Sequence, residues 1–485
     1  MEDKYMSSMS RKLLYVGLGL LLLMVLLVFF TAWAFKESEF VKDRVEQEAS
    51  EALGMQVRVE GPARLLFLPS PGLRIEDFNI RNGDAEWIQA SSMEVRLRTI
   101  PLLRGHIEVT EVELIQANLQ LERDVQGKLN FMPEPDEEPT EPEPFDLQRF
   151  ESREANLVFI DHESGERVEA QGCDWTMVEF DWQPAAPDSP GINLPSFQGE
   201  MACARLDFAG HTVNELHFQV FAQDGQAVFE ELTGEVLGGR FQGRLESDLA
   251  EDVPAHFLEL ELADFQILRF LETIHEEPQA EGSLDFIARL TFTGTELSEM
   301  VAGMNGHAEL SGRDLVFYGL DMDEMLDDYE DTQKFDLIDA GALFVAGPFG
   351  LVVSKAYDFG SIFIDTGAQT HIRVLYSEWE IIEGIAWSID VALSTQKNRL
   401  AMIGGLNFVN SRFEDMKVAV VDIEGCAIVE QSIEGDFDDP EIADPEFLAE
   451  LVGPLTDVVE RIIELFNDVE CDPFYTGRVQ HPQSE

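Results

Sequence analysis

Apolar and polar residues alternate along most of this chain, and the alternation predicts β-strands. Segments with a period of two recur between residues 56 and 122, between 201 and 294, and between about 342 and 435. Strict alternation is typical of a half-buried strand with one apolar and one wet face. Turn signals such as Pro69-Ser70-Pro71-Gly72 separate the segments, and no helical pattern of ten residues intervenes within 56–122. We therefore expect a meander of short strands and not βαβ units.

Helical patterns interrupt the strands at a few places, namely Glu37–Leu53, Ile267–His275, Glu296–Met304 and Asp321–Thr332. A longer amphipathic pattern at residues 446–467 predicts a helix that caps the end of a sheet, with a kink at Pro454. Its polar face is acidic, whereas a helix that lies on a membrane normally carries Lys and Arg there.

The stretch Leu13–Phe35 is apolar from end to end apart from two glycines and a threonine. As a helix it would extend about 34 Å, enough to cross a hydrocarbon core of about 30 Å. Lys4, Arg11 and Lys12 precede it, which places the short N-terminus in the cytoplasm and the rest of the chain beyond the membrane. A cleavable signal peptide is the alternative, because Ala32-Trp33-Ala34 resembles a cleavage site, but a signal's apolar region is only about 7–15 residues long.

These patterns divide the chain into six regions. They are a cytoplasmic N-terminus (1–12), a transmembrane helix (13–35), an N-terminal β module (36–132), an acidic Pro-rich linker or loop (133–145), a central β-rich region (146–295) and a C-terminal β region (296–485). The linker sequence PEPDEEPTEPEP has prolines, which lack ladder donors, and charges that repel, so we expect it to be extended.

The charge balance excludes one class of partner. With 33 Lys+Arg against 94 Asp+Glu, the formal net charge is −61, and nucleic-acid binding needs a basic footprint. An anionic bilayer would also repel the exported part of the chain. The hydrophobic fraction of 45% nevertheless indicates a folded chain and not a disordered acidic one.

The four cysteines, Cys173, Cys203, Cys426 and Cys471, form no C-x-x-C motif, and no histidine lies at ligand spacing from them. A zinc site is therefore not expected. Outside the cytoplasm an even number of cysteines suggests disulfides, for which three pairings exist. Cys173–Cys203 and Cys426–Cys471 are favoured because each pair lies within one apparent module. Free buried thiols are the alternative.

No catalytic or cofactor motif is recognisable. The histidines form no H-E-x-x-H motif, Ser164-Gly165 lacks the G-x-S-x-G pattern, and Gly238-Gly239-Arg240 lacks P-loop spacing and instead predicts a tight turn or bulge. Asp321–Asp331 is the best metal candidate because hard cations prefer carboxylates, but it lacks the glycine and the final glutamate of an EF-hand. We expect neither an enzyme nor a cofactor.

A series of blocks resembles a known family. Glu51–Ile80 combines a helix ending in glycine, a β-segment with a central glycine, and a Pro-x-Pro-Gly turn before an Arg-containing strand. The blocks that follow in order are Leu97–Gly105 (LRTIPLLRG), Leu119–Asn130, the hairpin FIDHESGERVE, Val236–Gly243, Met304–Leu320 and the tail Cys471–Pro482 (CDPFYTGRVQHP). Behind an N-terminal anchor, this order resembles the AsmA family.

The resemblance implies a single-pass protein of the Gram-negative cell inner membrane with a long periplasmic body, linked to outer-membrane assembly. Larger members resemble bridge-like lipid carriers, in which a twisted β-sheet forms a taco-shaped groove lined by apolar side chains. The expected fold is therefore mainly β, with one transmembrane helix, an elongated, twisted antiparallel sheet and short capping helices. The family carries no catalytic motif.

Two functions fit this sequence. In the first, the protein binds or transfers phospholipid or a related lipid along an apolar β-groove, and the membrane and lipids are its partners. Candidate lining residues are alternate positions in two strands, namely Leu258, Leu260, Leu262, Phe286, Ala288, Leu290 and Phe292. In the second, the alternation builds closed sandwich cores, and the protein is a non-enzymatic scaffold that assists outer-membrane assembly proteins through its sheet edges.

Overall fold

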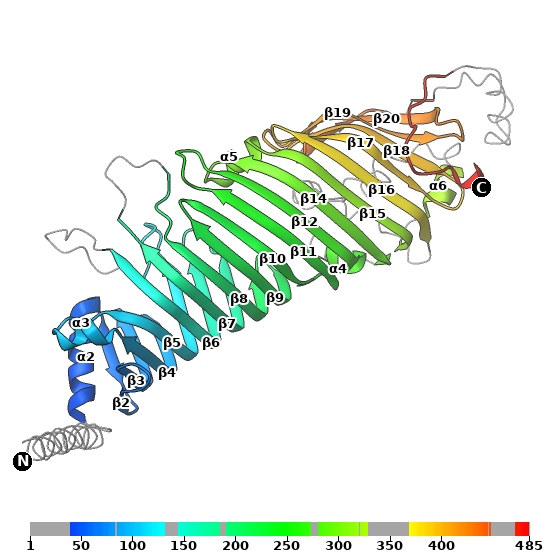
Figure 1. Ribbon diagram of the computed structural model, residues 1–485. Coiled ribbons are helices and arrows are strands. Elements are labelled where there is room, and N and C mark those ends of the chain that lie inside the picture. Colours follow the sequence, from blue (N-terminus) through cyan, green and yellow to red (C-terminus); the bar gives the residue numbers. More distant parts are fainter. Residues whose placement is uncertain are drawn as a thin grey trace, which may run out of the picture. The chain divides into compact units, whose positions relative to one another are not determined.

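The computed structural model describes residues 39–82, 85–130, 144–184, 191–272, 280–319, 321–327, 368–444, 446–447 and 471–484. Strands dominate these residues and helices are few and mostly short, which confirms the predicted mainly β fold (Figure 1). The chain divides into two compact units. Unit 1 comprises residues 1–184 and 197–209, and unit 2 comprises residues 185–196 and 210–485. The division therefore falls at residues 185–210 and not within the segment 133–145.

Unit 1 contains two helices and a twisted sheet. Its elements are α2 (Glu39–Leu53), β1 (Gln56–Val59), β2 (Ala63–Leu66), β3 (Gly72–Asn82), β4 (Ala85–Leu97), α3 (Thr99–Leu103), β5 (Val109–Arg123), β6 (Phe145–Asp161), β7 (Arg167–Trp182) and β8 (Ser196–Phe208). Both β1 and β2 pair with β3, and the ladder continues antiparallel through β4 to β5. Many of these strands are longer than the short ones expected.

The β5–β6 pair departs from the predicted meander, because these two strands run parallel. Glu111 aligns with Arg149 and Arg123 with Asp161. Between two parallel strands the chain must return to the end of the sheet where the first strand began, which usually takes a dozen residues or more. The segment between Arg123 and Phe145 supplies that length, and Phe145, predicted as the end of the linker, is the first residue of β6.

Helix α2 covers one face of the unit 1 sheet, as its amphipathic pattern predicts. Val45 and Ala49 pack against a core that includes Val57, Val59 and Phe78. Two α2 side chains also hold the edge strand, since Glu46 accepts a hydrogen bond from the backbone N–H of Val59 (2.7 Å) and Ser50 one from Val57 (2.9 Å). The helix therefore runs antiparallel to β1.

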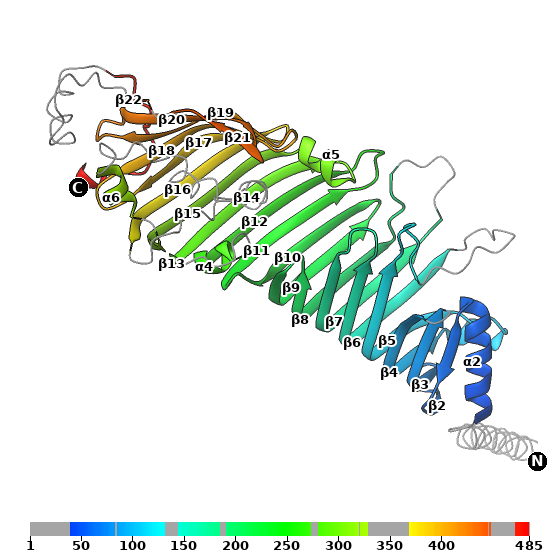
Figure 2. The same cartoon turned by 180° about the vertical axis from the view of Figure 1, so that it is seen from behind.

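Unit 2 is one long antiparallel ladder, and short helices lie at the ends of some of its strands (Figures 1 and 2). Its strands are β9 (His211–Gln223), β10 (Gln226–Val236), β11 (Gly239–Asp248), β12 (Ala255–Gln266), β13 (Ala280–Glu281), β14 (Ser283–Thr293), β15 (Asn305–Tyr318), β16 (Gln369–Ile382), β17 (Ile385–Ser394), β18 (Arg399–Asn407), β19 (Arg412–Val421), β20 (Ala427–Asp436), β21 (Asp439–Ile442) and β22 (Glu446–Phe447). Its helices are α4 (Ile267–Leu271), α5 (Leu297–Ala302), α6 (Met322–Asp327) and a 3-10 turn at Pro482–Ser484.

The ladder of unit 2 follows chain order from β9 to β12 and from β14 to β20. Strand β12 pairs with β14, because the two-residue β13 pairs with β15 beside it. At the far end β21 and β22 both pair with β20. Leu237 and Gly238, both at positive φ, close the β10–β11 hairpin, which is the tight turn expected at the Gly238-Gly239 pair.

Nine of the described strands contain a polar residue in the left-handed region, at φ between 46° and 55°. These residues are Asp77, Gln116, Glu154, Glu179, Glu215, Glu231, Asp264, Asp314 and Asp415. Several mark register shifts, for example between Phe229 and Leu232 and between Leu262 and Phe265. Such bulges bend a strand and increase its twist. Eight of these nine residues are acidic.

Two predicted helices fall largely outside the described residues. The apolar stretch 13–35 does so completely, and among the described helices none is long and apolar enough to span a membrane. Of the predicted helix 446–467, the structure describes only Glu446 and Phe447, and these form strand β22. The helix prediction is wrong at these two positions, because their backbone pairs with Val429 and Glu430 of β20.

Candidate functional site

The register of unit 2 gathers alternate apolar side chains on one face of its sheet. Residues that lie directly opposite in an antiparallel pair share a face. Between β12 and β14 the pairs are Leu258 with Leu290, Leu260 with Ala288, Leu262 with Phe286, and His256 with Phe292. Strand β11 adds Leu245, Gly243 and Phe241, and β15 adds Gly306, Ala308 and Leu310. We call this surface the apolar face. It contains all seven lining residues proposed from the sequence.

The apolar face is partly open on β11–β14 and closed further along the ladder. Leu258, Leu260 and Leu290 keep intermediate exposure, whereas Trp379 and Ile381, which continue the same rows on β16, are 1% exposed. From β15 to β20 the apolar face is the main core cluster of unit 2. Within this part, strands β18–β20 run in a different direction from β14–β16 (Figure 2).

Helices α4 and α6 cover part of this face. Ile267 and Leu271 of α4 are buried in the same cluster as Leu262 and Phe265 of β12. Met322 of α6 is fully buried there, and its backbone N–H donates to the hydroxyl of Thr370 (3.0 Å). The partly open stretch of the apolar face thus lies beside a closed core and not in the middle of a flat sheet.

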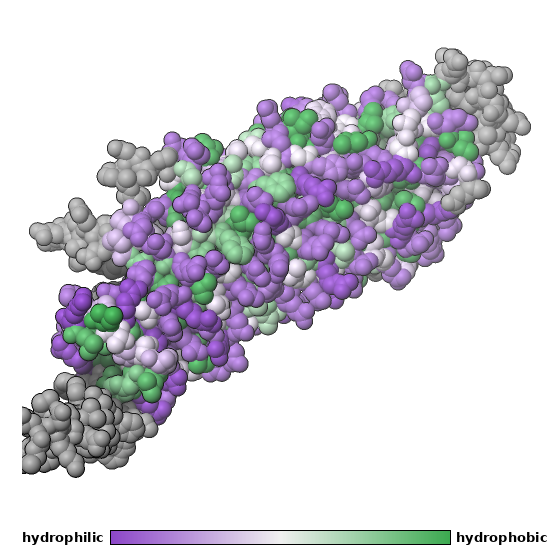
Figure 3. All heavy atoms as spheres, viewed as in Figure 1, coloured by the Kyte–Doolittle hydropathy of each residue, from purple (hydrophilic) through white to green (hydrophobic). Residues whose placement is uncertain are grey.

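The opposite face of the same strands is charged. Glu259 and Arg289, each next to a residue of the apolar face, form an ion pair at 2.7 Å. Gln242 donates to Glu261 at 2.8 Å, and Arg244 pairs with Glu246 at 2.8 Å. Figure 3 shows mostly hydrophilic residues over β9–β16. The sheet of unit 2 therefore separates an apolar surface from a charged one across its own thickness.

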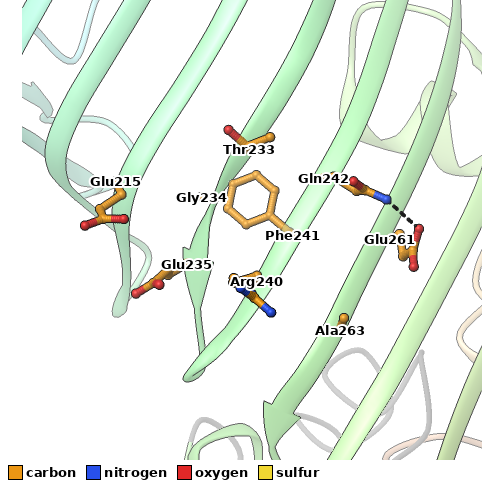
Figure 4. A pocket seen from close by; sticks show the side chains of 9 residues that line it. All are labelled: Glu215, Thr233, Gly234, Glu235, Arg240, Phe241, Gln242, Glu261 and Ala263. Carbon is orange, nitrogen blue, oxygen red and sulfur yellow. Dashed lines mark hydrogen bonds between the residues drawn. The ribbon is translucent and has the colours of Figure 1, made fainter.

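Shallow hollows on the charged side of the sheet are lined by both polar and apolar residues. One of about 420 Å³ lies between Glu215 and Ala263, and Figure 4 shows Gln242 and Glu261 bonded at its side and the Phe241 ring next to Gly234. A neighbouring hollow of about 550 Å³ is lined by polar residues such as His217, Glu231 and Arg289 and by the apolar residues Leu232, Leu260 and Ile287. Several of the polar side chains that line these hollows already pair with one another, namely Gln242 with Glu261 and Arg289 with Glu259.

Members of the apolar face on β9–β11 were not singled out from the sequence. Val220, Phe229 and Leu245 lie in the row that contains Leu258 and Leu290. The alternation in ELHFQVFA and FQGRLESDL carried the signal, but a sequence does not state which residues of neighbouring strands lie opposite each other.

The structure joins Cys173 to Cys203 and Cys426 to Cys471, the two pairs favoured from the sequence. The first links β7 to β8 in unit 1. The second ties the C-terminal tail, residues 471–484, to the turn before β20.

The C-terminal tail lies on the face of β16–β20 opposite the apolar face. Tyr475 and Val479 pack on small residues in register across three strands, Ala392, Ala401 and Ala419. The Tyr475 hydroxyl donates to Oδ1 of Asp390 (2.6 Å), and the backbone N–H of Arg478 donates to Oδ2 of the same carboxylate (2.9 Å). Burial raises the pKa of the Tyr475 hydroxyl. A Cβ at Gly477 would come within 2.1 Å of Asp390, so this turn requires glycine.

Among the described residues, no group of three or more His, Cys, Asp or Glu side chains lies close enough to hold a metal ion. In the described part of the acidic segment 321–331, two aspartates instead make hydrogen bonds within α6 and to neighbouring residues. Asp321 caps the backbone N–H of Glu324 (3.0 Å), and Asp323 accepts from Thr395 (2.5 Å) and Asn398 (2.8 Å). Residues 328–331 lie outside the described residues.

Comparison with known proteins identifies one family. The model of the AsmA family matches residues 7–137, a range that takes in the apolar stretch 13–35 and the elements from α2 to β5. The family predicted from the sequence is thereby confirmed for this part of the chain. Comparisons with curated proteins and with solved structures give no match.

Proposed function

We propose that this chain, whose residues 7–137 match the model of the AsmA family, is an inner-membrane-anchored periplasmic protein of outer-membrane biogenesis that binds or transfers phospholipid or a related lipid. The lipid's acyl chains lie against the apolar face of unit 2, and no catalytic residue or cofactor takes part.

The partly open stretch of the apolar face carries this proposal. Leu258, Leu260 and Leu290 retain intermediate exposure, although leucines at aligned positions of a closed core would be buried. Covering apolar surface stabilises by about 25 cal/mol per Å², and acyl chains would supply that cover. Charged side chains on the other face, such as Glu259 and Arg289, keep the outside wet.

The site has no need of a reactive group. Transfer of a lipid breaks no covalent bond, so a water-shielded apolar path is sufficient. The apolar stretch 13–35 supplies the anchor in this account, and the two disulfides suit an oxidising compartment outside the cytoplasm.

Mass spectrometry of the lipids that the full chain retains tests the proposal. The wild type is purified in detergent and compared with Leu258→Gln/Leu290→Gln and with Glu259→Gln, a matched change on the opposite face. We expect phospholipid in excess of the lipid held around the anchor in the wild type and in Glu259→Gln, and a loss of that excess in the double variant. Equal lipid in all three proteins would overturn the proposal, and an outer-membrane assembly protein retained in its place would favour the scaffold.

A further inference from the structure

Two segments of unit 1 depart from the charge of the rest of the chain. Residues 61–75 and 95–107 contain five arginines and a histidine but no aspartate or glutamate. Elsewhere acids are frequent, with 94 among 485 residues. The boundary acids Glu76, Glu94 and Glu108 are each engaged by an arginine of these segments.

The same segments expose large apolar side chains. Of the described large apolar residues, six are more than 60% exposed, and four of these are Leu68 (85%), Leu103 (83%), Ile107 (75%) and Ile100 (64%). Phe67, in the first of the two segments, is also exposed (47%). Isolated exposed leucines are ordinary, but a contiguous group marks an interaction surface.

Hydrogen bonds hold the two segments side by side. The backbone N–H of Leu97 donates to the carbonyl of Pro71 (2.8 Å), and Arg96 donates to the carbonyls of Leu68 (3.0 Å) and Ser70 (2.9 Å). Helix α3 begins two residues after Leu97. The turn 67–71 and the loop 98–107 therefore form one surface at one end of the sheet, which we call the loop pair.

The loop pair lies at the end of unit 1 where α2 begins. Because Glu46 bonds Val59 and α2 runs antiparallel to the edge strand, Glu39 is about 10 Å further toward this end, at a helical rise of 1.5 Å per residue. Leu66 is about 20 Å beyond Val59, because their partners on β3, Gly72 and Phe78, are six residue steps apart. The loop pair thus projects roughly 10 Å past Glu39. Only four residue steps, which span at most about 14 Å, separate Glu39 from the end of the apolar stretch 13–35.

We propose that the loop pair is a second membrane contact, which enters the surface of the bilayer that holds the anchor. Leu68, Ile100, Leu103 and Ile107 reach the headgroup and upper acyl region, about 5–10 Å deep as for other interfacial segments. Arg104 is exposed and has no ion pair within the described part of the chain, and it meets anionic headgroups. The inference rests on the anchoring in the proposed function, and it explains how so acidic a chain approaches an anionic surface.

A fluorescent environment probe on the full chain tests this contact. The native cysteines are all in disulfides, so the variants Leu68→Cys and Leu103→Cys each offer one thiol for an NBD label. The control is Val125→Cys, which is similarly exposed (60%) in a turn at the opposite end of the sheet. Each protein is reconstituted in vesicles of phosphatidylethanolamine and phosphatidylglycerol, and recovery of the vesicles by flotation verifies the anchor.

We expect blue-shifted emission and quenching by doxyl-labelled lipid at positions 68 and 103, and water-like emission at 125. The shift should weaken with Arg104→Glu and in vesicles of phosphatidylcholine alone. Water-like emission at 68 and 103 in vesicles that float would overturn the contact and point to a protein partner. The result is independent of the apolar face, because the variants leave β12 and β14 unchanged and lipid retention is measured on the same samples.

Discussion

Leu258 of β12 lies directly opposite Leu290 of β14, and both keep intermediate exposure in a sheet whose neighbouring part is a closed core. The adjacent residues Glu259 and Arg289 form an ion pair on the other side of the sheet. Neighbouring residues of the same strands thus contribute to opposite faces of the sheet, one apolar and one charged.

Truncation of Leu258 should cost much less than truncation of a core leucine of the same ladder. For Leu258→Ala we expect a loss of about 1 kcal/mol, and for Leu315→Ala, whose side chain is fully buried, about 3–4 kcal/mol. Denaturant unfolding of the delipidated full chain measures both. Equal losses would mean that the apolar face is as tightly packed at β12 as at β15.

The tail depends on the bond between Tyr475 and Asp390. Tyr475→Phe removes the hydroxyl donor from a carboxylate that is 7% exposed, which should cost about 1–3 kcal/mol. The matched control is Tyr318→Phe, because the Tyr318 hydroxyl donates to Glu281 at an exposed site and its loss should cost less than about 0.5 kcal/mol. Melting temperatures of the two variants compare the effects directly, and similar shifts would contradict the account.

Acid should loosen the tail through His481. Burial lowers the pKa of this imidazole, the nearby charge of Arg399 lowers it further, and Asp422 acts in the opposite direction. The folded state therefore favours the neutral ring, so stability is fully present above the unfolded pKa of about 6.5 and is lost as pH falls toward the lower folded pKa. Melting curves between pH 7.5 and 5 should show this loss in the wild type. His481→Gln should reduce it, and an unchanged pH dependence would exclude this histidine as the cause.

The Cys426–Cys471 bond should fasten the tail to the β19–β20 turn. It closes a loop with a separation of 45 residues, for which the chain-entropy model gives about 4 kcal/mol. In Cys426→Ser/Cys471→Ser, protease cleavage within residues 471–484 should accelerate. Cys173→Ser/Cys203→Ser serves as the control, since it lowers stability in unit 1 and should leave the tail protected.

Local pattern predicted most of the strands, because an alternating segment such as FLELELADF states which side chains share a face. It could not state the partner of each strand, so the rows through Leu258 and Leu290 follow only from the register. The bulge at Asp264 is a further example. It places Phe265 in the same core as Leu262, although their spacing of three contradicts simple alternation.

The two wrong predictions from the sequence also concern pairing between distant segments. The parallel β5–β6 pair depends on where the segment after Arg123 returns, which no local pattern records. Glu446 and Phe447 continue a helical periodicity, but the free edge of β20 offers backbone partners at Val429 and Glu430. The fit of Tyr475 over Ala392 and Ala401 likewise arises from strands far apart in sequence from the tail.

Site-specific photo-crosslinking in cells tests the central claim most directly. A benzophenone amino acid is placed at Leu258 or at Glu259, which are neighbours on one strand with side chains on opposite faces. After irradiation, the purified full chain is analysed by mass spectrometry for adducts. We predict a phospholipid adduct at position 258 and none at 259. Absence of lipid at 258, or equal labelling at both positions, would contradict a lipid-binding apolar face.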